Sequence, residues 1–421
     1  MDTIEPHLDA TGVAGGADES PSGDAPTPPT IRRVSRAEAA TTVEPLQAYA
    51  FGTTPTVPTS DEPAAPAEEE DDKVRLVAFD GAEPSAVVVG IPMRQNVRGV
   101  ILPMMGVSGV ATHPAARRRG HIRTLLTQLH ETMRDAGHVV STLYPFRPSF
   151  YERFGYVGFP MPRRIRLFPD GLDRLLRADA IPGEVTLHRI GEALDEFRQA
   201  LEHLLLERHG FSLYSPEAMA RYRSKDDRWV ALARHDGEVV GVLLYRSHGL
   251  GKDFEGHQLL TRGPLGRMLL LRWLARHHDQ HAAFTLELPP DERPDLWYVD
   301  IRYTDETKVA GPLHSAPMGR VLSVPGLAGL RVGAARATVE VVDDPFVAGT
   351  WTFDGSTGSL EVRSGGTPTA TLTSHGLAAL VYGVLDPTEI HLRGYGTMDA
   401  ATAQTLRTLF PAATPYLYAS F

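Results

Sequence analysis

Residues 110–126 have the sequence VATHPAARRRGHIRTLL, which joins a strand-like run to a helical one. Three consecutive arginines precede Gly120, where the helix is expected to begin. The first turn of a helix leaves backbone N–H groups without partners and carries partial positive charge, and glycine lets a ligand approach closely. The turn therefore either holds an anion such as a phosphate or is a solvated basic helix start, and its spacing leaves both interpretations open.

Composition limits the classes of protein to which this turn can belong. The chain has 421 residues and a formal net charge of −10, with 42% hydrophobic and 22% charged residues. We therefore expect two or three globular domains and no general nucleic-acid-binding surface. The absence of cysteine excludes disulfides, thiolate nucleophiles and cysteine metal ligands.

Targeting and metal-binding patterns are also weak. The amino terminus lacks the apolar core of a signal peptide, and no run approaches the roughly 18 apolar residues of a membrane span. We therefore predict a soluble, cytoplasmic protein. His277 and His281 have a spacing that suits a metal, but no acidic motif accompanies them. We expect a solvated helix end there and no metal site.

Strands are predicted on both sides of the turn, over residues 73–79, 86–93, 100–112 and 139–144. The helix after the turn has a clear pattern of apolar residues at helical spacing, with Gly137 as its carboxy-terminal cap. These apolar residues are Ile122, Leu125, Leu126, Leu129, Met133 and Ala136.

The rest of the chain divides into two further regions. Residues 180–300 repeat the order strand, helix, hairpin, helix, but have no Arg-x-x-Gly at the helix near Leu265. The last 110 or so residues combine short strands, Gly-rich turns and two helical patterns, which is typical of an α+β domain. The sequence thus predicts α/β and α+β architecture; if the middle unit is a duplicate of the first, it kept the fold and lost the anion site.

A second motif, FYERFGY (150–156), follows the predicted strand at 139–144. Tyr151 is either part of an aromatic core or a phenol available for proton transfer. With VATHPAARRRG (110–120), this motif resembles the enhanced intracellular survival (Eis) family of GCN5-related N-acetyltransferases, the GNAT superfamily. The resemblance implies two tandem GNAT-like domains and a sterol-carrier-protein-like domain. The expected regions are a disordered tail at 1–29, a catalytic domain at 30–170, a second GNAT-like domain at 171–305 and the carrier-like domain at 306–421.

The resemblance also implies how acetyl-CoA is bound. In the superfamily an Arg/Gln-x-x-Gly-x-Gly/Ala turn holds the pyrophosphate; here the last small residue is replaced by Ile122, a departure that weakens the generic match. Backbone groups of the preceding strand hold the pantetheine arm and polarise the thioester. The implied cofactor-binding residues are Val110, Ala111, Thr112, Arg117, Arg118, Arg119, Gly120, His121 and Ile122.

The implied reaction is acetyl transfer to a primary amine of aminoglycoside or lysine type, by direct attack in a ternary complex. Tyr151 is then the general acid, and the terminal carboxylate of Phe421 is the general base. The family also implies a homo-oligomer, a hexamer in many members, and the chain needs no metal. The alternative from another class is a non-catalytic carrier of acyl-CoA or lipid, and on this view Phe421 is an ordinary frayed terminus.

Overall fold

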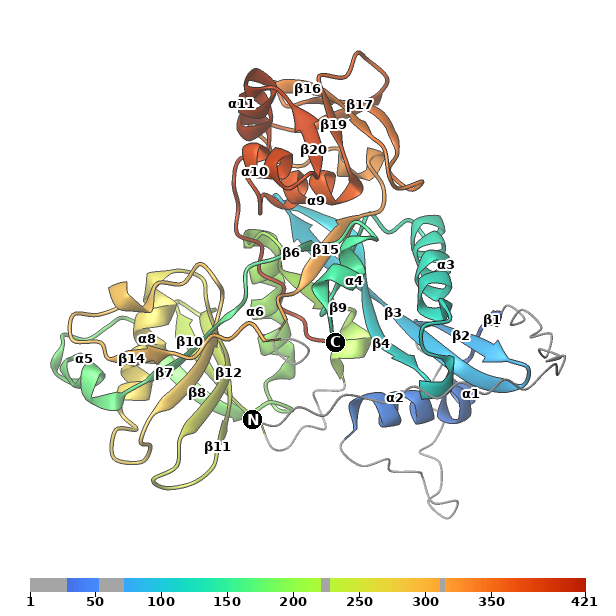
Figure 1. Ribbon diagram of the computed structural model, residues 1–421. Helices are drawn as coiled ribbons and strands as arrows, with labels where there is room; N and C mark the ends of the chain where they lie inside the picture. Colours follow the sequence, from blue (N-terminus) through green and yellow to red (C-terminus); the bar gives the residue numbers. More distant parts are fainter. Residues whose placement is uncertain (1–28, 53–71, 221–227, 311–314) are drawn as a thin grey trace, which may run out of the picture.

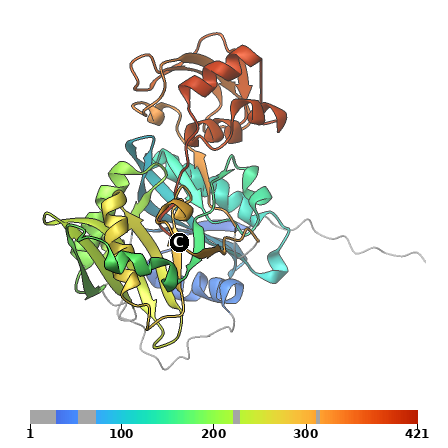
Figure 2. The same cartoon turned by 90° about the vertical axis from the view of Figure 1, so that its left-hand side faces the viewer.

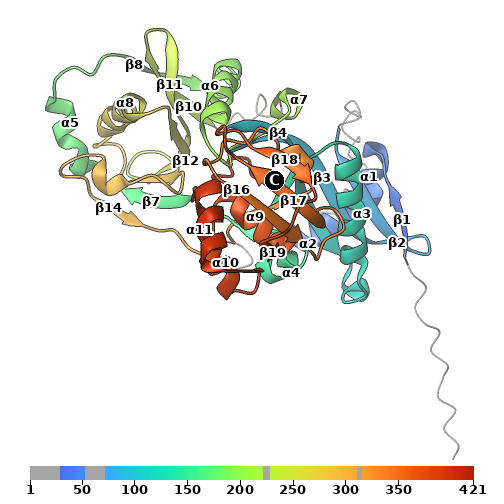
Figure 3. The same cartoon turned by 90° about the horizontal axis from the view of Figure 1, so that it is seen from above.

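The computed structural model describes residues 29–52, 72–220, 228–310 and 315–421. The tail expected to be disordered at 1–29 lies outside these residues apart from Pro29. The described chain forms three units, each built on one sheet (Figure 1). The third unit stands above the first two in Figures 1 and 2, and seen from above it lies over their junction (Figure 3).

The first unit contains a mixed sheet with the order β1-β2-β3-β4-β5-β15-β6, and β9 pairs with the far half of β3. All these pairings are antiparallel except that of β4 with β5. Its strands are β1 Thr30–Arg33, β2 Val74–Asp80, β3 Glu83–Val97, β4 Val100–Thr112, β5 Val140–Leu143, β6 Val157–Gly158, β9 Ser212–Tyr214 and β15 Met318–Val321.

Helices cover both faces of this sheet. Helix α3 packs its apolar stripe against β2, β3 and β4, while α2 and α6 contact β3 and β4. Four leucine and methionine side chains of α3 are fully buried, as the helical spacing predicted, and Gly137 follows the helix end with a φ of +83°. The helices are α1 Arg36–Thr42, α2 Glu44–Phe51, the short 3-10 helix η1 Pro114–Ala116, α3 His121–Asp135 and α4 Pro148–Glu152.

The second unit repeats the central arrangement of the first. A hairpin is followed by a strand, a helix and a strand parallel to the one before the helix, as in β2-β3-β4-α3-β5. Its sheet has the order β14-β7-β13-β12-β11-β10-β8. The strands are β7 Arg163–Leu167, β8 Glu184–Arg189, β10 Trp229–His235, β11 Glu238–Ser247, β12 Phe254–Thr261, β13 Phe284–Leu288 and β14 Tyr303–Asp305. The helices are η2 Pro169–Leu172, α5 Asp173–Arg177, α6 Leu194–Glu207, α7 Pro216–Met219, α8 Pro264–Ala275 and η4 Pro294–Leu296.

Three strands pair across the expected domain limits at 170 and 306. β7 precedes residue 170 but joins the second sheet, between β14 and β13. β9 and β15 follow that residue but join the first sheet. The first two units are therefore interlocked by strands rather than joined end to end.

The third unit is an α+β domain whose sheet has the order β18-β17-β16-β19-β20. Its elements are η5 Pro325–Leu327, β16 Arg336–Val341, β17 Gly349–Asp354, β18 Glu361–Ser364, β19 Ala370–Leu372, α9 Ser374–Tyr382, α10 Pro387–Leu392, β20 Gly396–Met398 and α11 Ala400–Leu409. After α11 the chain has no further helix or strand, and it returns to end between the first two units (Figure 1).

Candidate active site

The arginine–glycine turn connects β4 to α3. Gly120 is the residue before the helix, with a φ of +86°, and no side chain caps the helix start. Arg118 also has a positive φ, +66°, which is unusual for a residue with a side chain. Added to Gly120 a Cβ atom would meet nothing within 4 Å, so the turn is open. The helix start thus offers N–H donors in a backbone that is strained at one arginine.

The three arginines differ in their partners. Arg119 donates to both carboxylate oxygens of Asp80, at 2.6 and 3.2 Å. Arg117 and Arg118 are exposed, and their side chains make no hydrogen bond or ion pair with the described part of the chain. His121 is buried, and its Nδ1 is hydrogen-bonded to Ser85 Oγ at 3.1 Å. The side chains of Arg119 and His121 therefore hold the turn against the β2–β3 hairpin, and Arg117 and Arg118 are the cations left for a ligand.

β4 and β5 separate before β4 ends. Their parallel pairing runs from Met104 opposite Val140 to Val107 opposite Leu143, whereas β4 continues to Thr112. On its other edge β4 has a bulge against β3, where Gly109 has a φ of +56°. Gln47 of α2 donates to the carbonyl of Gly109 at 3.2 Å and braces the bulge. The residues after Val107, including Val110, Ala111 and Thr112, therefore line one side of a fork between the two strands.

Tyr151 lies on α4, shortly after β5. Its side chain is 2% exposed and packs edge-to-face against Phe146, Phe150 and Tyr156. The hydroxyl makes no hydrogen bond to another described residue. Burial raises the pKa of Tyr151 well above its ordinary value, so the phenol stays protonated at neutral pH.

Phe421 lies at the fork. The ring packs against the backbone of Gly106 so closely that a Cβ there would be 2.7 Å from it. On the other side it meets the ring of Tyr144, with centroids 5.6 Å apart. Gly106 immediately precedes the last paired residue of β4, and Tyr144 follows β5. The ring of Phe421 therefore lies where the two strands diverge.

Hydrogen bonds fix the approach of this terminus. The hydroxyl of Tyr144 donates to the carbonyls of Leu417 and Ala419, at 3.3 and 3.1 Å. The hydroxyl of Tyr214, on β9, donates to the carbonyl of Ser420. Since β9 lies on β3 of the first sheet, strands of the same sheet hold the tail from two directions.

The side chains of the tail are mostly buried as well. Tyr418 stacks on Phe211, with ring centroids 4.7 Å apart, and the N–H of Tyr416 donates to the carbonyl of His209. Tyr416, Leu417, Tyr418 and Ala419 are each no more than 5% exposed. Burial of four successive residues anchors the terminus at a defined place.

A buried hydrogen-bond chain behind Tyr151 was not found from the sequence. Arg320 of β15, 2% exposed, donates to Asp344 of the third unit at 2.5 Å and to His130 Nδ1 at 3.1 Å. Because arginine can only donate, the proton of neutral His130 is on Nε2, which donates to the hydroxyl of Tyr156 at 3.0 Å. Burial and the charge of Arg320 hold the pKa of His130 well below its ordinary value.

The same chain continues to the central strand. Tyr156 donates to Ser141 Oγ at 2.8 Å, and Ser141 donates to the carbonyl of Met105 at 2.8 Å. Burial raises the pKa of Tyr156 to about 12. Met105 precedes Gly106, so the chain of bonds links the third unit to the point of β4 on which Phe421 packs. The sequence carried a weak signal for it, since Tyr156 belongs to the FYERFGY motif, but the partners lie up to 190 residues away.

Family models match two parts of the chain. A model of the acetyltransferase (GNAT) domain matches residues 30–158, and a model of the sterol carrier protein domain matches residues 327–418. Over 86 residues the chain is 38% identical to the N-acetyltransferase Eis of Mycobacterium tuberculosis and of Mycobacterium bovis. Residues 30–158 thus resemble a GNAT acetyltransferase domain, and part of the chain is similar to Eis. The Eis alignment covers 19% of this chain and only about a fifth, 21%, of the length of the curated relatives.

Solved structures share the fold over nearly the whole chain. Eis1 from Mycobacterium abscessus has a TM-score of 0.70 and 20% identity, and covers 93% of this chain and 100% of its own. A GCN5-related N-acetyltransferase from Kribbella flavida has a TM-score of 0.74 and 21% identity, over 93% and 99%. The predicted architecture agrees with the family models at the two ends of the chain, and the unit between them repeats the strand order of the first.

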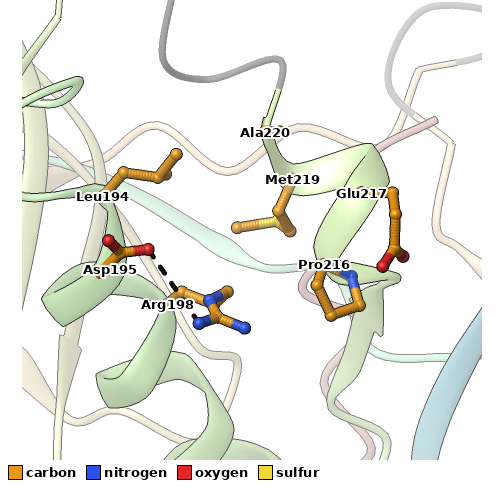
Figure 4. Close-up of a pocket in the computed structure, with 7 residues that line it drawn as sticks. All are labelled: Leu194, Asp195, Arg198, Pro216, Glu217, Met219 and Ala220. Carbon is orange, nitrogen blue, oxygen red and sulfur yellow. Dashed lines mark ion pairs between the residues drawn. The ribbon is translucent and has the colours of Figure 1, made fainter.

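Two cavities lie outside the fork. One, of about 270 Å³, lies between the starts of α6 and α7, where Asp195 faces Arg198 across 4.0 Å (Figure 4). It borders Ala220, the last described residue of its segment, and we assign it no role. The other, of about 560 Å³, lies where α3 and α4 meet the third unit.

The described residues contain no group of three or more His, Asp and Glu side chains placed to hold a metal ion. The expectation of a solvated end at His277 and His281 is wrong for His281. This side chain is 6% exposed, and its Nδ1 donates to the carbonyl of Lys252 at 3.0 Å, because the chain after α8 folds back onto Phe254. In the described part of the chain no helix has the length and apolar character to span a bilayer.

Proposed function

We propose that this chain is an acetyl-CoA-dependent N-acetyltransferase that acetylates primary amines of aminoglycoside or lysine type. The observation that carries the proposal is the position of Phe421, whose ring packs on Gly106 and Tyr144 at the fork of β4 and β5. GNAT acetyltransferases use acetyl-CoA, which gives this fork its expected ligand.

In this proposal the turn binds the diphosphate. Arg117 and Arg118 supply charge-assisted donors, and the N–H groups near Gly120 supply the helix start. The side chains of Arg119 and His121 support the turn, so these two residues contact the diphosphate through their backbone groups. Val110, Ala111 and Thr112 offer backbone groups to the pantetheine arm, and Ile122 and Val110 both pack against the apolar cluster beneath α3.

The reaction needs one proton removed and one supplied. The amine nitrogen forms a bond to the thioester carbonyl carbon, the carbon–sulfur bond breaks, and the amine proton passes to the carboxylate of Phe421. Tyr151 donates to the departing thiolate and regains its proton from solvent. Because its raised pKa keeps the phenol protonated, Tyr151 first donates a hydrogen bond to the sulfur and transfers its proton only as the thiolate leaves.

The sterol-carrier-protein match at 327–418 keeps a second candidate open, a carrier that binds an acyl-CoA or a lipid without turnover. The decisive experiment measures thiol release from acetyl-CoA with a panel of amines, alongside calorimetric binding. Acetyl-CoA binding with amine-dependent thiol release supports the transferase. Binding without release supports the carrier.

The role of the terminus is tested by adding one glycine after Phe421. We expect at least a hundredfold loss of kcat with acetyl-CoA affinity retained, because the carboxylate moves away from the fork. The control is the same glycine added at the amino terminus. Undiminished turnover of the carboxy-terminal variant would remove Phe421 as the base. A homo-oligomer, a hexamer by family resemblance, and a cytoplasmic location complete the proposal; light scattering tests the first and cell fractionation the second.

A further inference from the structure

The larger cavity, of about 560 Å³, is bounded by the first unit on one side and the third unit on the other. Arg123 of α3 and Ser149 and Arg153 at α4 line it from the first unit. Thr373, His375 and Tyr395 line it from the third unit. We call it the inter-unit cleft.

The acidic and basic side chains of the inter-unit cleft differ in whether they have hydrogen-bond partners in the protein. Glu152 accepts a hydrogen bond from the hydroxyl of Tyr395 at 2.6 Å, across the two units. Asp343 accepts from the N–H and hydroxyl of Ser374, at 2.6 and 3.3 Å. Both acids of the cleft are thus engaged by protein donors.

The cations of the cleft have no such partners. Arg123 and Arg153 are exposed and form no ion pair with the described residues; Arg153 lies over the ring of Phe150, at 5.2 Å. Two guanidinium groups that flank a cavity and pair with no carboxylate favour a ligand with concentrated negative charge.

The third unit contributes an unusual group to the cleft. His375 is 7% exposed, and its Nδ1 is buried without a hydrogen-bond partner. Its ring lies 4.0 Å from that of Tyr395, tilted by 33°. A buried nitrogen left without a partner is costly unless a ligand or water completes it. The pair thus offers a flat surface beside an unfilled polar site, which suits a heterocyclic ring.

The position of the cleft relates these features to the proposed function. Arg123 is three residues beyond Gly120, so it lies about 4.5 Å further along the helix from the proposed diphosphate turn. Ser149 flanks Tyr151 on the short helix α4. Acetyl-CoA has its thioester on one side of the diphosphate and an adenosine with a 3′-phosphate on the other. With the thioester at the fork and the diphosphate at the turn, the adenosine lies beyond the turn, on the side of the inter-unit cleft.

We propose that the inter-unit cleft binds the nucleotide end of acetyl-CoA, with the 3′-phosphate between Arg123 and Arg153 and the adenine against His375 and Tyr395. This inference rests on the proposed function and extends it. It gives the sterol-carrier-like unit a second part in the reaction, because that unit both ends in Phe421 and forms one wall of the nucleotide site.

The test compares acetyl-CoA with acetyl-3′-dephospho-CoA by calorimetry on the full chain. We expect the wild type to bind acetyl-CoA about tenfold or more tightly, as charge-assisted contacts to one phosphate typically give. The double variant Arg123→Ala, Arg153→Ala should lose this preference while binding the dephospho form as before. Arg276→Ala, an exposed arginine at the end of α8, is the control and should keep the preference.

The contribution of the third unit is tested by His375→Leu, which should weaken both ligands several-fold without changing their ratio. Unchanged affinities would exclude the third unit from the site. Equal binding of the two ligands by the wild type, or a preference that survives the double variant, would overturn the inference and leave the transferase standing. If acetyl-CoA neither binds nor is turned over, the proposed function itself fails. Thermal melting confirms that each variant is folded.

Discussion

Removal of the Asp344 carboxylate should loosen the attachment of the third unit to the first. Arg320 and Asp344 are 2% and 9% exposed at their side chains, so this is a buried ion pair and not a surface one. In Asp344→Ala the guanidinium stays buried without its counter-charge, which typically costs about 3–5 kcal/mol. A surface pair loses about 1 kcal/mol or less. The expected destabilisation is therefore several times that of an ordinary ion-pair deletion.

Native-state hydrogen exchange measures this cost where it arises, at the amides of β15, because a chain of three units need not unfold in one step. The opening free energy of those amides should fall by about 3–5 kcal/mol in Asp344→Ala. The control is Asp386→Ala, which breaks an exposed pair with Arg407 inside the third unit and also removes the N-cap of α10. The double variant Arg320→Met, Asp344→Leu should recover most of the loss, because no charge stays buried. Equal costs for Asp344→Ala and Asp386→Ala would refute the reasoning.

Three further predictions concern the site and its surroundings. Tyr151→Phe should lower kcat about 100-fold and spare acetyl-CoA affinity, with Tyr49→Phe, an exposed tyrosine, as the control; full-speed turnover would remove Tyr151 as the acid. Tyr144→Phe removes the donor to two tail carbonyls and should speed carboxypeptidase release of Phe421 about tenfold; an unchanged rate would show that other contacts hold the tail. Burial lowers the pKa of His209 to about 4, so its unfolded form takes up a proton first. The contribution of His209 to the free energy of unfolding should be fully present above pH 6.5 and should fall by up to about 1.4 kcal/mol per pH unit between pH 6.5 and 4. In His209→Gln the urea midpoint should therefore depend less on pH in that window.

Local features of the fold could be predicted because local chemistry determines them. The spacing of apolar residues after Gly120 indicated the buried face of α3 and the residue at which the helix begins. The interlocking strands could not be predicted in this way. β9 and β15 are three and four residues long, and their partners lie more than a hundred residues away. So short an apolar run fits any available sheet edge, and the rest of the fold decides which edge is available.

The candidate site likewise combines local features that could be predicted with long-range contacts that could not. Gly120 and Tyr151 could be proposed from the sequence because each belongs to a contiguous motif. The different engagement of the three arginines was not visible, since Asp80, the partner of Arg119, lies 39 residues earlier. Tyr144 was counted only as the end of a strand, and its hold on the terminus depends on a carbonyl 275 residues away.

The third unit is therefore more than an appendage to the first. Its chain ends at the fork, its Asp344 balances the arginine whose hydrogen bonds lead to Met105, and its His375 forms part of the inter-unit cleft. Each contact alone could be a packing detail of a two-unit interface. Together these three contacts connect the third unit to the first through the tail at the fork, through the hydrogen bonds that end at Met105 of β4, and through the cleft beside α3. A change that only loosens this interface should thus lower acetyl transfer before it unfolds either unit, and Asp344→Ala supplies that change because its carboxylate pairs with Arg320 of the first sheet.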